Sequence, residues 1–364
     1  MRRYGYIFLS LLLLVSCTKV QTESEEAVVF SLDTKAVQSA VTGSTYRIMM
    51  YNDKDRSYRQ SGTYYLKPGV ADLVACEITE TGVIENPQMG INGVSDKVYL
   101  VLASPGISCN NDGSFNFIPD KAGSFYLNEP ELKTIGGYGP VSFTKPLYDP
   151  RSKLSFEFYK KSGVVDFSVV GSKVKVIGVQ SEKENVRIYP ALRQVKMASN
   201  KQEREMPLTY VKDPDVNQTQ DNYELFYSTS MPLYVASGIY ASKKEVASHL
   251  KMVTTSNILD GEYIYMACNI EQAGRRVEIR MPLNDQILEL LPQYHYVYRI
   301  LVESDYVGVV LDVYDSTDST TNGWQTGGSS SSNIGTLSKT IDLGRWTING
   351  WHPADKDGIN FTIG

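Results

Sequence analysis

Apolar and polar residues alternate with a period of two along most of the chain. This alternation is typical of β-strands that have one face buried and the other exposed to water. The clearest alternating runs are Tyr46 to Met50, Val98 to Leu102, Leu154 to Phe158, Val165 to Val169, Val174 to Val176, Val277 to Leu283, Tyr296 to Val302 and Val307 to Val313. Many short strands separated by turn residues favour packed β-sheets over alternating strands and helices.

Two segments have a helical pattern. They are Lys243–Met252 and Asn284–Leu291, and Pro292 ends the second. Both are short, so the pattern predicts an all-β fold with few short helices.

The chain is long enough for two domains. Pro146 and the pair Asp149-Pro150 interrupt the strand pattern, and a new alternating run begins at Leu154. We therefore predict one β-sandwich domain over residues 28–150 and a second over residues 151–364.

The end of the chain has an unusual order of segments. A Gly/Ser-rich stretch, Gly327 to Ser332, is typical of a flexible linker. Strand-like pieces follow it within residues 333–364, namely Thr340 to Leu343, Trp346 to Ile348 and Ile359 to Ile363. We expect this tail to pair either with its own sheet or with the sheet of a neighbouring molecule.

The first 17 residues have the pattern of an export signal. Arg2 and Arg3 precede an apolar run from Ile7 to Val15, which is too short to span a bilayer. Leu14-Val15-Ser16-Cys17 resembles the lipobox of bacterial lipoproteins. The sequence thus predicts a signal peptide over 1–16, fatty acylation (palmitate among the acyl groups) on Cys17, and a polar tether over 17–27.

Net charge and cysteine content restrict the classes of partner and the kind of cross-link that we expect. Removal of 16 residues from 364 leaves 348, and loss of Arg2 and Arg3 takes the formal net charge from −5 to −7. A mildly acidic chain is a poor match for nucleic acid. The remaining cysteines, Cys76, Cys109 and Cys268, are odd in number and widely spaced, so we expect buried free thiols and no disulfide framework.

No catalytic motif is present in the sequence. Gly136 to Gly139 is rich in glycine but has neither the following helix nor the lysine of a phosphate loop. The acidic stretch from Asp312 to Asp318 fits a solvated hairpin loop better than a calcium site. The three histidines are far apart. We therefore expect a protein that is not an enzyme and that binds no cofactor and no metal.

Several of these features together resemble the fimbrillin family, which forms the type V pili of Bacteroides-like bacteria. The first is the lipobox and tether followed by a strand, Val28 to Leu32. The second is the strand opening Lys153 to Phe158. The third is the run Val277 to Leu283 with its short insert, then Tyr296 to Tyr298 and a hairpin ending at Trp324.

The resemblance implies two transthyretin-like (Greek-key) sandwiches and polymerisation by strand exchange. In the family, a protease specific for Arg or Lys removes the first strand after export. Here the candidate first-strand side chains are Val28, Phe30 and Leu32, and Lys35 occupies the place where family members commonly carry Thr-Arg. Arg47 is a second candidate for cleavage, inside a predicted strand.

The Gly/Ser stretch and the strand-like pieces after it suggest what fills the groove that removal of the first strand would open. An extended segment of a neighbour would add to the open sheet by β-augmentation. The candidate donor side chains are Ile341, Leu343, Trp346 and Ile348.

We therefore expect a structural subunit of a surface pilus, exported as an outer-membrane lipoprotein. Its expected partners are other copies or related pilus subunits, the outer membrane through the lipid, and a host or microbial surface receptor. The alternative is a lipid-anchored adhesive or glycan-binding β-sandwich protein that does not polymerise. A pilus anchor or tip protein is also part of this alternative, and a member that is not cleaved would keep its lipid and serve as an anchor or cap.

Overall fold

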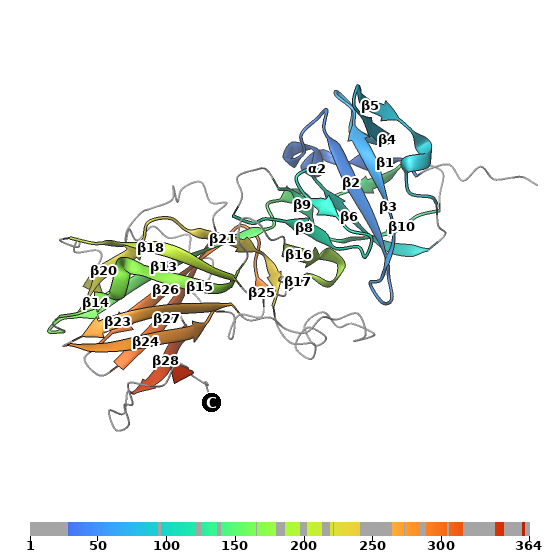
Figure 1. Cartoon of the computed structure of the whole chain (residues 1–364). Helices are drawn as coiled ribbons and strands as arrows, with labels where there is room; N and C mark the ends of the chain where they lie inside the picture. Colours follow the sequence, from blue (N-terminus) through green and yellow to red (C-terminus); the bar gives the residue numbers. More distant parts are fainter. Residues whose placement is uncertain are drawn as a thin grey trace, which may run out of the picture.

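A computed structural model describes residues 28–93, 96–120, 125–136, 140–164, 166–179, 186–196, 202–212, 219–220, 222–240, 264–272, 274–283, 289–303, 306–315, 339–345 and 359–360. The fold is all-β, as the alternation predicts. Figure 1 shows two lobes with a smaller group of strands between them.

The N-terminal lobe is built on a ten-stranded sheet. Its main path runs β11-β1-β4-β3-β2-β6-β9-β12, while β10 pairs with β6 and β5 pairs with β4. The strands are β1 (Phe30–Leu32), β2 (Thr45–Asn52), β3 (Tyr58–Leu66), β4 (Asp72–Thr79), β5 (Gly82–Glu85), β6 (Lys97–Ala103), β9 (Leu127–Asn128), β10 (Glu131–Thr134), β11 (Val141–Phe143) and β12 (Leu147–Tyr148).

The C-terminal lobe is built on a thirteen-stranded sheet whose main path is β28-β27-β26-β13-β20-β18-β15-β23-β24-β29. The long strands β13 and β26 pair in parallel, and most other neighbours are antiparallel. The strands are β13 (Arg151–Lys161), β14 (Ser168–Val169), β15 (Lys173–Val179), β18 (Gln202–Tyr210), β19 (Thr219–Gln220), β20 (Tyr223–Thr229), β21 (Leu233–Ala236), β23 (Tyr265–Gln272), β24 (Arg275–Pro282), β26 (Tyr294–Val302), β27 (Tyr306–Asp315), β28 (Lys339–Arg345) and β29 (Ile359–Asn360).

A third, six-stranded sheet joins chain segments from both sides of residue 150, in the order β25-β22-β17-β16-β8-β7. β8 pairs with β16 through Phe115↔Ile188 and Phe117↔Val186. Its strands are β7 (Ser108–Cys109), β8 (Phe115–Phe117), β16 (Val186–Tyr189), β17 (Gln194–Lys196), β22 (Gly238–Ile239) and β25 (Glu289–Leu290). The two lobes therefore share main-chain hydrogen bonds as well as a covalent connection.

The same alternation that predicts the strands distributes side chains between two cores. On β2, Ile48 and Met50 face a core that belongs to the N-terminal lobe alone. Met49 and Tyr51 point the opposite way, into a core that continues through the third sheet to the C-terminal lobe. Both faces of β2 are buried because strand residues alternate between the faces of a sheet.

Two arginines add polar contacts at the junction of the lobes. Arg204 forms an ion pair with Asp120. Arg151 donates to the backbone oxygen of Pro119 at 3.2 Å and forms an ion pair with Asp149 at 2.6 Å. Each guanidinium comes from the C-terminal lobe, and each contacts the turn that ends at Asp120.

Helices are few and short among the described residues. They are α2 (Thr34–Ser39) and the 3-10 helices η1 (Pro87–Met89), η2 (Val170–Ser172) and η3 (Pro190–Leu192). No helix in the described part of the chain is both long and apolar enough to span a bilayer. The predicted helix Asn284–Leu291 is wrong at its described end, since Glu289 and Leu290 pair with Ile239 and Gly238 as strand β25. The predicted helix Lys243–Met252 lies outside the described residues.

Candidate strand-exchange site

The first strand, β1, lies inside the N-terminal sheet. It pairs in parallel with β11 on one side and antiparallel with β4 on the other. Further main-chain hydrogen bonds join Leu32 N–H to Ala71 O at 2.8 Å and Asp33 N–H to Phe143 O at 2.9 Å. A strand that is bonded on both sides leaves two unpaired strand edges when it is removed.

The side chains of β1 fill the core of the N-terminal lobe. Phe30 is 0 % exposed and Leu32 is 4 % exposed. The Phe30 ring meets Tyr64 edge-on, with ring centres 5.1 Å apart, and lies 5.7 Å from the ring of Phe143. Val28, the third residue predicted for this strand, precedes β1 and is only partly buried, although it packs against the same core.

The Tyr64 hydroxyl holds the backbone of Val28, just before β1, against the backbone of Ile91. Its hydroxyl accepts a hydrogen bond from Ile91 N–H at 2.7 Å and donates one to Val28 O at 3.3 Å. Burial raises the pKa of the Tyr64 phenol well above its ordinary value of 10.0, so the group stays protonated and keeps its donor role. Val28 N–H in turn donates to Ile91 O at 2.8 Å.

Lys35 is the second residue of helix α2, directly after β1, and is exposed. The Asp33 carboxylate accepts hydrogen bonds from Lys35 N–H and Ala36 N–H, both at 3.0 Å. This is an N-cap, which stabilises a helix start by about 1 kcal/mol. An aspartate ahead of a short polar run is the local signal for α2, and the apolar periodicity that predicts the other elements does not contain it.

Arg47 lies in the middle of β2, which pairs with β3 and β6. Its guanidinium donates to Thr63 Oγ1 at 2.8 Å, and its Nε is buried without a hydrogen-bond partner. A protease binds its substrate as an extended segment whose own backbone is free. The peptide bond after Arg47 lacks that freedom in the folded lobe, whereas Lys35 lies on the surface.

Glu131 is a buried residue of this region that sequence reasoning missed. It is 4 % exposed, and its carboxylate accepts hydrogen bonds from Thr144 N–H at 3.0 Å and Lys145 N–H at 2.9 Å. Burial alone would raise the pKa of Glu131, but the ammonium of Lys133 and these N–H donors outweigh it and lower the pKa. The contacts fix the turn after β11, the strand that pairs with β1.

The described strands of the predicted donor tail, β28 and β29, pair with the sheet of their own C-terminal lobe. β28 pairs antiparallel with β27, with Ile341 opposite Val309, and forms one end of the main path of the sheet. β29 pairs in parallel with β24 through two residues, Ile279↔Ile359 and Arg280↔Asn360. Leu343 belongs to β28, while Trp346 and Ile348 lie outside the described residues.

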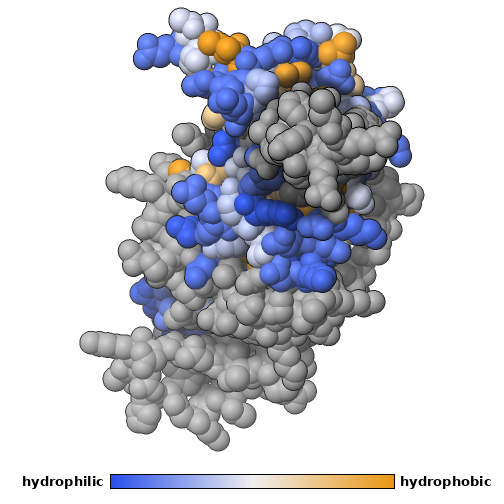
Figure 2. Space-filling view, turned by 90° about the vertical axis from the view of Figure 1, so that its right-hand side faces the viewer, coloured by the Kyte–Doolittle hydropathy of each residue, from blue (hydrophilic) through white to orange (hydrophobic). Residues whose placement is uncertain are grey.

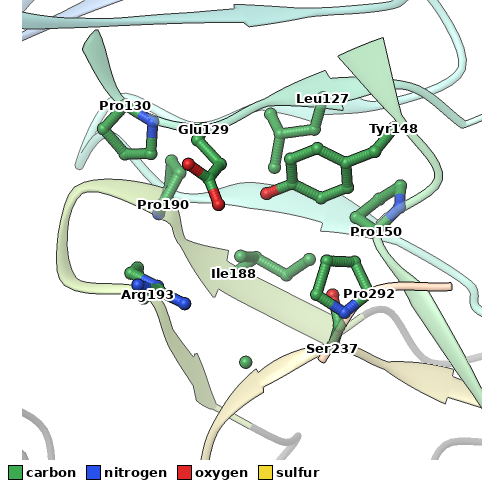
Figure 3. A pocket seen from close by; sticks show the side chains of 11 residues that line it. Leu127, Glu129, Pro130, Tyr148, Pro150, Ile188, Pro190, Arg193, Ser237 and Pro292 are labelled. Carbon is green, nitrogen blue, oxygen red and sulfur yellow. The ribbon is translucent and has the colours of Figure 1, made fainter. Parts of the chain in front are cut away.

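A small pocket lies at the junction of the lobes (Figure 3). Its volume is about 40 Å³, room for about three water molecules. Glu129 and Tyr148 enter it from the N-terminal lobe, and Arg193 and Ser237 enter from the other side. Four proline rings also line it, those of Pro130, Pro150, Pro190 and Pro292.

The outer end of the N-terminal lobe is largely hydrophilic (Figure 2). Apolar side chains gather at its top, where Figure 1 places the β4–β5 hairpin. Ile78, Val83 and Ile84 of that hairpin are 63 %, 39 % and 52 % exposed.

The remaining predicted site features concern cysteines and acids. Cys17 lies outside the described residues. Cys76, Cys109 and Cys268 are free thiols, of which Cys76 and Cys268 are buried as expected, whereas Cys109 is only partly buried. Burial raises the pKa of Cys268 to about 12. Asp312 belongs to β27 rather than to a loop and pairs with Arg299 at 2.8 Å. The described residues contain no group of His, Cys, Asp and Glu suited to a metal ion.

Comparison with known proteins gives structural similarity only. No protein-family model matches the chain, and no curated protein does. A candidate cell adhesion protein from Bacteroides uniformis is similar, with 10 % identity, a TM-score of 0.36, and coverage of 81 % of this chain and 99 % of that one. A fimbrial assembly protein from Parabacteroides distasonis is similar with 12 % identity and a TM-score of 0.33, and the match covers 79 % of this chain and 95 % of that one. The tip fimbrial protein of Porphyromonas gingivalis, truncated at its C-terminus, is similar with 9 % identity and a TM-score of 0.31, and the match covers 79 % of this chain and 99 % of that one.

Proposed function

We propose that this protein is a structural subunit of a surface pilus, exported as an outer-membrane lipoprotein through Cys17 and assembled by strand exchange. The observation that supports this most directly is the position of β1. It is the first strand after the tether, and it is bonded on both sides within its sheet. One cut after β1 would therefore separate an interior strand, together with the lipid, from the rest of the chain.

Reburial of the side chains and strand edges at the groove would contribute energy to assembly. Burial of Phe30 and Leu32 contributes about 1.5 to 3 kcal/mol each, and the exposed edges of β11 and β4 add unpaired main-chain groups. A groove with this much apolar surface does not stay open in water. An extended segment of a second copy would cover the same surface and pair with the same edges.

The structure around the candidate cleavage site, Lys35, favours regulated cleavage of the precursor. Lys35 is exposed, but it belongs to the N-capped helix α2. Since proteases cleave extended chains, α2 must unwind first, which costs about 1 kcal/mol for the cap alone. The precursor would thus stay closed until a protease of matching specificity captures the unwound segment.

The test uses limited digestion of the full mature chain with a Lys-specific protease. We expect ladders or filaments from the cleaved wild-type chain, monomers from the Lys35→Gln variant, and ladders again from the control Lys54→Gln, which changes another exposed lysine. Monomers from wild type after complete cleavage at Lys35 would favour an anchor or cap role. Equal ladders from Lys35→Gln would exclude cleavage at Lys35 as the trigger.

The pocket at the lobe junction supports a second candidate function, a glycan-binding surface protein that does not polymerise. The four proline rings that line the pocket offer apolar faces of the kind that pack against the C–H face of a sugar, and its volume of about 40 Å³ admits only part of one sugar ring. Isothermal titration with a panel of oligosaccharides tests it. Binding that is lost in the Tyr148→Phe variant would support this function, and no heat from any sugar would remove it.

A further inference from the structure

We infer that the outer edge of the β4–β5 hairpin is a contact surface between two copies of this chain. The copies pair antiparallel through β5 about a two-fold axis, with Ile84 facing Ile84 of the second copy. This inference goes beyond the proposed function, because it involves neither the β1 groove nor cleavage at Lys35. The pair would form equally well between uncleaved chains.

β5 is an edge strand with exposed apolar side chains. Gly82 to Glu85 are all exposed, and Figure 1 places β5 at the rim of the N-terminal lobe. Within the part of the chain that the structure describes, β5 pairs with β4 and with no other strand. Ile84 is 52 % exposed on one face of the hairpin. Ile78 and Val83 lie opposite each other on the other face and are 63 % and 39 % exposed.

The pairing of β5 with β4 shows which main-chain groups point outward. Asn86 N–H donates to Ala75 O at 2.9 Å, and Ile84 lies opposite Glu77 two residues earlier in the ladder. Hydrogen-bonded and non-hydrogen-bonded pairs alternate along an antiparallel ladder. Ile84 therefore bonds to β4, while Val83 and Glu85 direct their N–H and C=O groups away from it. The outer edge presents two donors and two acceptors to a further strand.

β5 lacks the features that usually protect a sheet edge from a second strand. Protected edges carry lysine, proline or a bulge, and Val83-Ile84-Glu85 has none of these. Its one charged residue, Glu85, forms an ion pair with Lys67 at 2.7 Å. An apolar strand with outward main-chain groups is a site for β-augmentation.

An antiparallel copy of β5 satisfies this edge best in one register. With Val83 opposite Glu85 of the second copy, both residues of each pair present outward groups, so the two pairs exchange four hydrogen bonds. The two-fold axis then passes between the two Ile84 residues, whose Cα atoms would lie about 4.5 Å apart. The register with Val83 opposite Val83 secures only two hydrogen bonds, because Glu85 then faces Thr81, a turn residue outside β5.

The charges near the seam suit a second copy, which offers the same apolar and charge-balanced edge. Glu85 is already paired with Lys67 of its own chain. Glu77 lies on β4, so the two Glu77 residues would be three strand spacings apart, about 14 Å. That distance exceeds the screening length of about 8 Å at physiological salt. Self-pairing through β5 therefore brings no unpaired like charges close together.

The paired edge is short, so the contact is weak in dilute solution. Four residues from each copy are far fewer than the roughly 20 to 30 residues that each side of a stable interface contributes. The pair is closed, because each copy uses its β5 edge once. Copies held close together on one surface would pair at a raised effective concentration.

The test traps the pair as a disulfide in the uncleaved full mature chain, with Cys17→Ser in every variant and oxidised glutathione as the oxidant. Ile84→Cys should form a cross-linked dimer at least about tenfold faster than Met231→Cys, because Cα atoms about 4.5 Å apart suit a disulfide. Met231 is 75 % exposed on the C-terminal lobe, so its cross-linking measures random collision. The chain with Cys17→Ser alone corrects for the native thiols. Equal rates for Ile84→Cys and Met231→Cys would overturn the inference.

Val83→Cys tests the register. In the proposed pair the two Val83 residues are offset by two positions along the strand, and their Cα atoms lie about 8 Å apart, too far for a disulfide. This variant should therefore cross-link no faster than Met231→Cys. Faster cross-linking of Val83→Cys than of Ile84→Cys would show that the proposed register is wrong.

A proline separates main-chain pairing from general adhesion of apolar side chains. Val83 N–H points away from β4, so Val83→Pro removes hydrogen bonds of the pair and none of the hairpin. Added to Ile84→Cys, it should return cross-linking to the rate of Met231→Cys, while hydrogen exchange of the β4 amides shows that the hairpin is intact. Unchanged cross-linking with an intact hairpin would exclude main-chain pairing through β5. Since no chain in these experiments is cleaved, their outcome is independent of whether strand exchange occurs.

Discussion

The most direct test of the first strand is the change Phe30→Ala in the uncleaved precursor. Phe30 is 0 % exposed and lies among the rings of Tyr64 and Phe143. Removing a buried phenyl ring costs about 3 to 5 kcal/mol, from lost transfer energy and the cavity left behind. That is a large share of the roughly 5 to 15 kcal/mol by which a domain is stable.

The readout must report on the N-terminal lobe. All three tryptophans, Trp324, Trp346 and Trp351, lie near the C-terminus, so their fluorescence does not serve. Hydrogen exchange of the β4 and β11 amides, measured at increasing guanidinium concentration, gives the change in free energy of unfolding and its location in the N-terminal lobe. Faster exchange should appear first in β4 and β11, because β1 pairs with both.

Val29→Ala is the matched control. Val29 is 50 % exposed and neighbours Phe30 in sequence, and exposed substitutions usually change stability by less than about 0.5 kcal/mol. A loss below about 1 kcal/mol for Phe30→Ala, where a buried ring should cost several times more, or equal losses for both variants, would refute the claim that β1 completes the core of the lobe.

Three further predictions concern the anchor, a buried histidine and the thiols. Cys17→Ser should remove the protein from the outer-membrane fraction, because the lipid is its predicted attachment; persistence in the detergent phase would contradict this. Burial, helped by the charge of Lys153, lowers the pKa of His295 to about 4. The unfolded state takes up the proton at a higher pH than the folded state, so the free energy of unfolding should fall by up to about 3 kcal/mol as pH drops from about 6.5 towards 4. His295→Gln should flatten this pH dependence in denaturation curves. An unchanged pH dependence would exclude His295 as its source. Cys268 should react with a thiol reagent only at the unfolding rate, because it is 5 % exposed and burial raises its pKa to about 12; fast labelling of Cys268 in the native chain would show an accessible thiolate.

The sequence alone determined the class of the fold and the position of its longer strands. Side chains that alternate over five or more residues, as in β13, β26 and β27, report directly on a sheet with one face in a core. Local sequence carries this information because a strand imposes the period of two wherever it packs.

Tertiary structure alone decided how the strands are joined. The third sheet uses strands as short as Ser108–Cys109 and Gly238–Ile239, which are too short to display any period. β25 has a helical pattern in the sequence but adopts a strand, because Leu290 and Glu289 pair with β22. The carboxylate of Glu131 is buried only because Thr144 and Lys145 reach it from a later turn. The hydrogen-bond partners in each case are distant along the chain, and no local pattern encodes them.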